Sequence, residues 1–164
     1  MTHEPYAGGR DDRPVIAVND RGLTLGQDAG GTWIIWNEDD TVWPRHTVWR
    51  AYDRLLWLLP LLQQPQKAVV DAVSAVKGGG ELLTAVLRYA LGCWSDYWAG
   101  LALGWLETGY PAAGLLDALR ALKDSARQPQ PVRHRALRLV PKGLVGGDGR
   151  ESNPPGPGSG PHRF

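Results

Sequence analysis

The sequence predicts a mainly α-helical protein with a small antiparallel β element near its N-terminal end. Short runs of β-branched and aromatic residues, bounded by turn residues, fill positions 14–36. Apolar residues at helical spacing fill positions 43–140. Proline and glycine divide this second region into segments of about 10 to 16 residues, joined by short connections. We therefore expect a compact multi-helix bundle or a stack of helical hairpins.

The chain divides into one predicted globular domain and two predicted tails. Residues 14–140 form the domain, because the 164-residue chain is 43% hydrophobic and can bury a core without disulfides or a structural metal. Residues 1–13, which are polar, and residues 141–164, which are rich in glycine and proline, are expected to be disordered. The single Cys93 is expected to be a small buried hydrophobic residue in a reduced compartment.

The predicted β element has two or three strands joined by tight turns. The strand candidates are Val15–Val18, Leu23–Leu25 and Thr32–Trp36. Residues 19–22 and 30–31 carry the Asn, Asp and Gly residues that favour turns. Such a small sheet is marginally stable alone, so we expect helices to cover it.

The predicted helices begin at proline or capping residues and carry one apolar stripe each. Their expected ranges are 44–59, 65–76, 81–91, 96–106, 111–126 and 131–140. Ser95 and Asp96 are suited to begin the fourth helix, but one long bent helix over residues 81–108 satisfies the same pattern. The sequence leaves these two alternatives open.

Composition and motifs narrow the function classes. The charge balance of 18 Lys+Arg to 17 Asp+Glu argues against a strongly basic nucleic-acid binder. Neither a targeting segment nor a membrane span is predicted, which favours a cytoplasmic protein. No phosphate-binding, metal-binding or nucleophile motif is present, so no catalytic residue, metal or cofactor is assigned. A weaker enzyme hypothesis would use Glu38, Asp39 or His46.

The last predicted helix is basic on one side. Seven Lys or Arg residues and one acid lie between Arg120 and Lys142. The helical projection places Val132 and Ala136 inward and Arg135 and Arg138 outward. These outward arginines, with Arg127 and Arg133, are candidate ligands for an acidic protein surface or for nucleic acid, although a solvated helix face explains them as well.

Tryptophan is unusually frequent, with eight Trp against one Phe. If Trp33 and Trp36 lie on one strand, their odd separation places them on opposite faces of the sheet. Most tryptophans are expected to pack in the core, but Trp33 and Trp36 are also candidates for an aromatic binding groove. The sequence does not decide between core and interface.

These observations favour a non-enzymatic protein-interaction or adaptor domain. The candidate binding residues are Trp33, Trp36, Arg127, Arg133, Arg135 and Arg138. The alternative is a helical nucleic-acid-binding protein that uses the basic C-terminal helix. Gly100 and Gly104 form a small-residue surface that would allow close packing of another helix, either within the fold or from a second copy of the chain.

Overall fold

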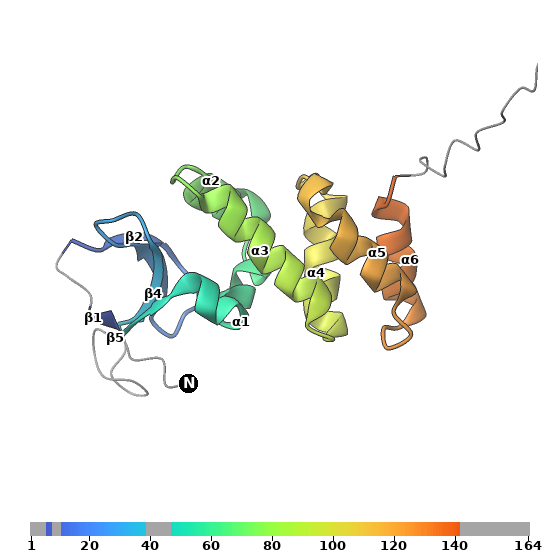
Figure 1. The fold of residues 1–164 in the computed structure, drawn as a ribbon, viewed down its shortest axis with the longest axis horizontal. Coiled ribbons are helices and arrows are strands. Elements are labelled where there is room, and N and C mark those ends of the chain that lie inside the picture. The colour runs from blue at the N-terminus through green and yellow to red at the C-terminus, as the bar shows by residue number, and fades with distance from the viewer. Residues whose placement is uncertain (1–5, 8–10, 39–46, 142–164) are drawn as a thin grey trace, which may run out of the picture.

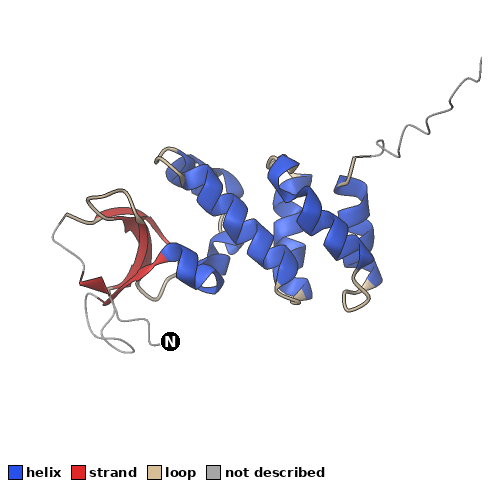
Figure 2. Ribbon diagram, viewed as in Figure 1, coloured by secondary structure: helices blue, strands red, loops and turns tan. Residues whose placement is uncertain are grey.

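A computed structural model describes residues 6–7, 11–38 and 47–141. It confirms the predicted class, because an antiparallel sheet near the N-terminus is followed by helices (Figure 2). The elements follow one another along the longest axis of the molecule, from the sheet at one end to α6 (Gln130–Leu139) at the other (Figure 1). The predicted tails lie largely outside the described residues.

The sheet contains five antiparallel strands in the order β1-β5-β4-β3-β2. Their bounds are β1 Tyr6–Ala7, β2 Arg13–Ala17, β3 Leu23–Gln27, β4 Trp33–Asn37 and β5 Thr47–Arg50. The turn between β2 and β3 forms as predicted, because the Asn19 side chain accepts hydrogen bonds from the backbone N–H groups of Arg21 (3.0 Å) and Leu23 (3.1 Å). Gly22 supplies the positive φ of 85° that this turn requires.

The prediction of a helix over residues 44–59 is wrong for residues 47–50, which form β5. Val48 and Trp49 are β-branched and aromatic, and they pair with Trp36 and Ile35 of β4. Long-range pairing thus overrides the local helical spacing. β1 likewise lies within the predicted tail 1–13 and pairs with β5. Pro44, the expected start of the helix, lies outside the described residues.

The helical part begins directly after β5 and contains six α-helices and three 3₁₀ helices within the described residues. Their bounds are η1 Ala51–Arg54, α1 Leu55–Leu58, η2 Leu59–Gln63, α2 Gln66–Ser74, α3 Gly79–Gly92, α4 Asp96–Glu107, η3 Ala113–Leu115, α5 Leu116–Asp124 and α6 Gln130–Leu139. Neighbouring helices pack in sequence, α2 on α3, α3 on α4 and α5 on α6, and α6 also packs on α4. This sequential packing is that of stacked helical hairpins.

Residues 81–108 form two helices, which settles the alternative left open by the sequence. Ser95 is the N-cap of α4, and its hydroxyl accepts a hydrogen bond from the backbone N–H of Trp98 at 3.4 Å. The chain reverses between α3 and α4 at Trp94, whose φ is 62°.

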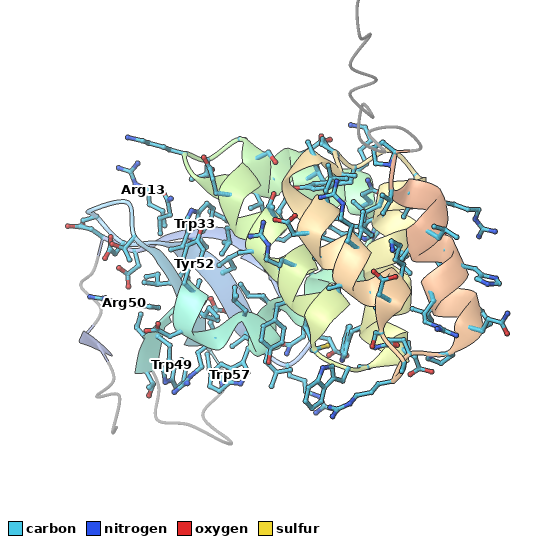
Figure 3. All side chains as sticks on the ribbon, turned by 45° about the vertical axis from the view of Figure 1, so that its right-hand side comes forward. Arg13, Trp33, Trp49, Arg50, Tyr52 and Trp57 are labelled. Carbon is cyan, nitrogen blue, oxygen red and sulfur yellow. The ribbon has the colours of Figure 1, made fainter. Side chains whose placement is uncertain are left out.

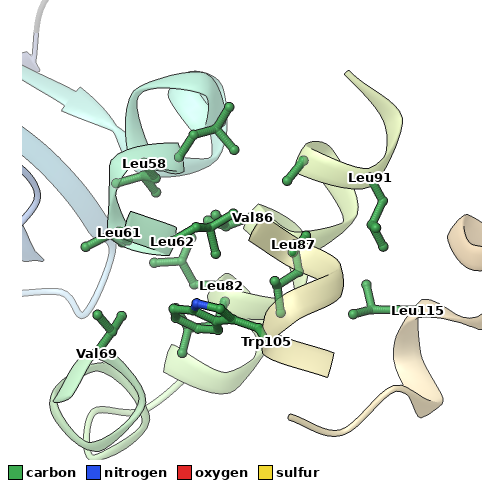
Figure 4. Packing of buried hydrophobic residues seen from close by; sticks show 14 of the residues in the cluster. Leu58, Leu61, Leu62, Val69, Leu82, Val86, Leu87, Leu91, Trp105 and Leu115 are labelled. Atoms are coloured by element: carbon green, nitrogen blue, oxygen red, sulfur yellow. The ribbon is translucent and has the colours of Figure 1, made fainter. Parts of the chain in front are cut away.

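The core runs continuously from the inner face of the sheet through the helices. Trp105 of α4 is 5% exposed and lies among leucine and valine side chains from η2 and α3 (Figure 4). Leu25 and Ile35 bring the sheet into the same cluster. Two glutamines also join the parts: the Gln64 side chain donates to the carbonyl of Ala17 at 2.9 Å, and Gln27 donates to the carbonyl of Lys77 at 2.9 Å.

Candidate functional site

Trp33 and Trp36 lie on opposite faces of the sheet, as their spacing predicts. Trp33 is 5% exposed, belongs to the core cluster and packs beside Gly78 at the start of α3. Trp36 lies over Gly26 on the other face, is half-buried, and donates a hydrogen bond from its Nε1 to Glu38 at 3.4 Å. The two rings therefore do not form one aromatic groove.

Arg135 of α6 binds inside the fold. Its Nε and Nη2 donate to the two carboxylate oxygens of Glu107 at 2.8 and 2.7 Å, and Nη2 also donates to the carbonyl of Gly100 at 3.1 Å. The guanidinium lies against Gly100 and Gly104, so these small residues make room for it within the fold. The hydrogen bond from Arg135 lowers the pKa of Glu107 and raises the pKa of Arg135 itself, against the opposing effect of burial. Arg135 thus joins α6 to α4.

The other predicted arginines of α6 differ in their surroundings. Arg133 is half-buried, and its Nε has no hydrogen-bond partner in the described part of the chain. Arg138 is exposed, and together with His134 and Arg135 it lines a shallow hollow of about 380 Å³. Figure 3 shows Trp33 at the sheet, and Figure 1 shows α6 at the opposite end of the molecule, so the predicted tryptophans and arginines do not share one face.

Sequence reasoning missed Trp94, which is the most exposed large apolar side chain of the described residues, with 73% of its surface accessible. Its φ of 62° is the only positive φ at a non-glycine residue among those described. The position directly after a helix end favours glycine when φ is positive, because a Cβ there costs about 1 to 2 kcal/mol. The fold therefore holds a large ring in water on a backbone that disfavours any side chain.

Arg127 contacts Trp94, and the exposed Tyr97 follows Trp94 three residues later in the chain. The guanidinium of Arg127, in the α5–α6 connection, lies over the ring of Trp94 at 4.5 Å from its centroid. Tyr97, in the first turn of α4, is 53% exposed, and its hydroxyl accepts a hydrogen bond from the side chain of Gln63 at 2.8 Å. We call Trp94, Tyr97 and Arg127 the Trp94 surface.

A second candidate site is a pair of hollows that meet at Gly80, Tyr110 and Pro111. The larger, of about 670 Å³, lies between α2 and residues 108–111, and the smaller, of about 550 Å³, lies beside η3. Polar side chains at these hollows already have partners within the fold: Thr108 donates a hydrogen bond to Gln66, and Arg88 donates to the carbonyl of Gly114. The hollows are large enough for a small molecule, but the hydroxyls of Thr84 and Tyr110 at the smaller one also bond within the fold, to the carbonyl of Gly80.

Two other sequence-based expectations can be placed in the structure. Glu38 is exposed, whereas Asp39 and His46, the other members of the enzyme hypothesis, lie outside the described residues. Among residues 6–7, 11–38 and 47–141 there is no group of three His, Cys, Asp or Glu side chains arranged to hold a metal. Over the same residues, no helix has the length and apolar character that crossing a membrane requires.

Comparison with protein-family models, with curated proteins and with solved structures finds no match for this chain. Function is therefore inferred from the residues and their geometry.

Proposed function

We propose that the protein is a protein-interaction or adaptor domain that binds a partner protein through the Trp94 surface, in a binding rather than a catalytic role. The observation that carries this proposal is Trp94 itself. Exposed aromatic surface and a positive φ at a bulky residue are both unfavourable for folding. Such features are concentrated at binding and active sites. A binding role gives the ring the apolar neighbour that the fold does not supply.

The composition of the surface supports the same role. Trp, Tyr and Arg are the residue types most enriched among those that dominate binding energies at protein interfaces. Together, Trp94 and Tyr97 expose about 300 Å² of side chain, given roughly 200 to 250 Å² for a large aromatic group.

The site differs from the one proposed from the sequence. Of the six candidate residues, Arg127 remains in it, while Trp33 is buried and Arg135 is bound to Glu107. The pairing of Arg135 also weakens the nucleic-acid alternative, because it removes one of the charges that would face a phosphate backbone.

The test is the affinity of the full chain for a partner recovered by chemical cross-linking and then purified. We expect Trp94→Gly to weaken binding by about 30-fold or more, the effect of removing a dominant interface residue. The matched control is Leu137→Ala, which removes an apolar side chain of α6 that is 54% exposed, and it should bind as the natural chain does. Equal affinities of Trp94→Gly and the natural chain would refute the proposal.

A further inference from the structure

We propose that the Trp94 surface recognises a carboxylate that stands beside an apolar side chain, so that the partner segment is an acidic and partly apolar peptide. Arg127 would bind the carboxylate, and Trp94 would pack against the apolar group. This inference rests on the proposed function and names the chemistry of the partner.

Arg127 is held in a position suited to binding an anion. Its guanidinium lies over the ring of Trp94, 4.5 Å from the ring centroid, and this cation–π contact favours one position of the side chain before any ligand arrives. The guanidinium carries five N–H donors, and none of them forms a hydrogen bond or ion pair with a residue that the structure describes. A carboxylate matches two of these donors at once.

Two other arginines of the helical region, Arg120 and Arg135, differ from Arg127 because their charges are already paired. Arg135 binds Glu107 through two hydrogen bonds, and Arg120 lies 3.4 Å from the carboxylate of Asp117. Arg127 forms no ion pair with any residue that the structure describes. It therefore offers an uncompensated charge directly beside the exposed ring, and this charge calls for an acidic ligand.

The local acids favour a peptide carboxylate over nucleic acid. Asp96 is exposed two residues after Trp94, and Asp124, whose carboxylate is bound by Lys123 at 2.6 Å, lies three residues before Arg127. A nucleic acid carries a charge at every nucleotide, so its backbone would meet these acids as well as Arg127. A single carboxylate between apolar groups meets only the arginine and the ring.

The test uses two small probes, N-acetyl-L-phenylalanine, which is a carboxylate at neutral pH, and its uncharged amide. Each is titrated into the full ¹⁵N-labelled chain, and binding is followed by the indole N–H signal of Trp94 and the side-chain N–H signal of Arg127. We expect the acid to bind about tenfold more tightly than the amide, as one charge-assisted contact allows. Arg127→Gln should abolish this difference, whereas Arg138→Gln, which removes an exposed arginine from α6, should leave it unchanged.

Three results would overturn the inference. These are equal affinity for the acid and the amide, shifts that lie away from Trp94 for both probes, and salt-sensitive binding of a short DNA duplex that moves the same signals more strongly than the acid does. The proposed function is judged separately. If a purified partner needs Trp94 but binds Arg127→Gln as tightly as the natural chain, only the carboxylate inference fails.

Discussion

Substitution of Trp94 by glycine and by alanine should affect stability differently, and the difference measures the backbone strain at this position. About a quarter of the Trp94 side chain is buried, and both variants lose the contacts of this part. At about 25 cal/mol per Å², the lost burial lowers the free energy of unfolding by about 1.5 kcal/mol. Both also lose the contact with Arg127, worth about 0.5 to 1 kcal/mol at an exposed site. Only glycine relieves the positive φ.

We therefore expect Trp94→Ala to lower the free energy of unfolding by about 2 kcal/mol and Trp94→Gly by about 1 kcal/mol, since relief of a left-handed residue returns about 1 kcal/mol. Urea unfolding followed by circular dichroism measures both values. Trp105→Ala provides the contrast, because that ring is 5% exposed in the core and its removal should lower stability by about 3 to 5 kcal/mol.

Two outcomes would refute this reasoning. If the alanine variant were as stable as the glycine variant, Trp94 would not occupy a strained backbone position. If Trp94→Gly lost as much stability as Trp105→Ala, the ring would be part of the core, and its exposure would no longer indicate a binding role.

Three further predictions concern close packing and charge. Gly79→Ala should lower the free energy of unfolding by about 3 kcal/mol or more, because the new Cβ would lie 1.8 Å from the carbonyl oxygen of Val73. The Cβ of Gly80→Ala meets no atom within 4 Å, so this control should be neutral or stabilising by up to about 1 kcal/mol. Chemical denaturation of the two variants measures the difference. Glu107→Gln should destabilise the chain by about 1 to 2 kcal/mol near neutral pH, because the charge of a partly exposed pair with Arg135 is lost while its geometry is kept. Arg135 lowers the pKa of Glu107 in the folded chain, so the pair stabilises the fold above the usual pKa of 4.5, and this contribution is lost as the pH falls below that value. Thermal unfolding of Glu107→Gln should therefore depend less on pH in the acid range than that of the natural chain.

The helices could be predicted from the sequence because their signals are local. Ser95 caps α4 with its own hydroxyl, and the leucines of α3 repeat at the spacing that one buried face requires. The turn at Asn19 is local in the same sense, since its side chain bonds to N–H groups two and four residues later. In each case the residues that decide the structure are within one turn of each other.

The strand β5 could not be predicted because its sequence satisfies two patterns. Val48 stands at a helical spacing from the leucines of α1, yet it is 2% exposed in the sheet. What decides between them is the pairing of Val48 with Trp36 and with Tyr6 of β1, and both partners are distant in the sequence. The spacing of apolar residues along the chain carries no information about partners on other strands.

The candidate site shows the same division between local and distant information at the level of single side chains. Arg127 and Arg135 are both part of the basic segment and both are candidate ligands for a partner, and the helical projection places Arg135 on the outward side of the last helix. Glu107, which neutralises Arg135, is 28 residues away. Trp94, which contacts Arg127 without neutralising it, lies in the connection between α3 and α4. The sequence shows the excess of arginine, but only the fold shows which guanidinium has N–H donors that are not already bound within the protein. The arginine beside an exposed ring, rather than the one at the centre of the basic helix, is therefore the residue whose substitution should change binding.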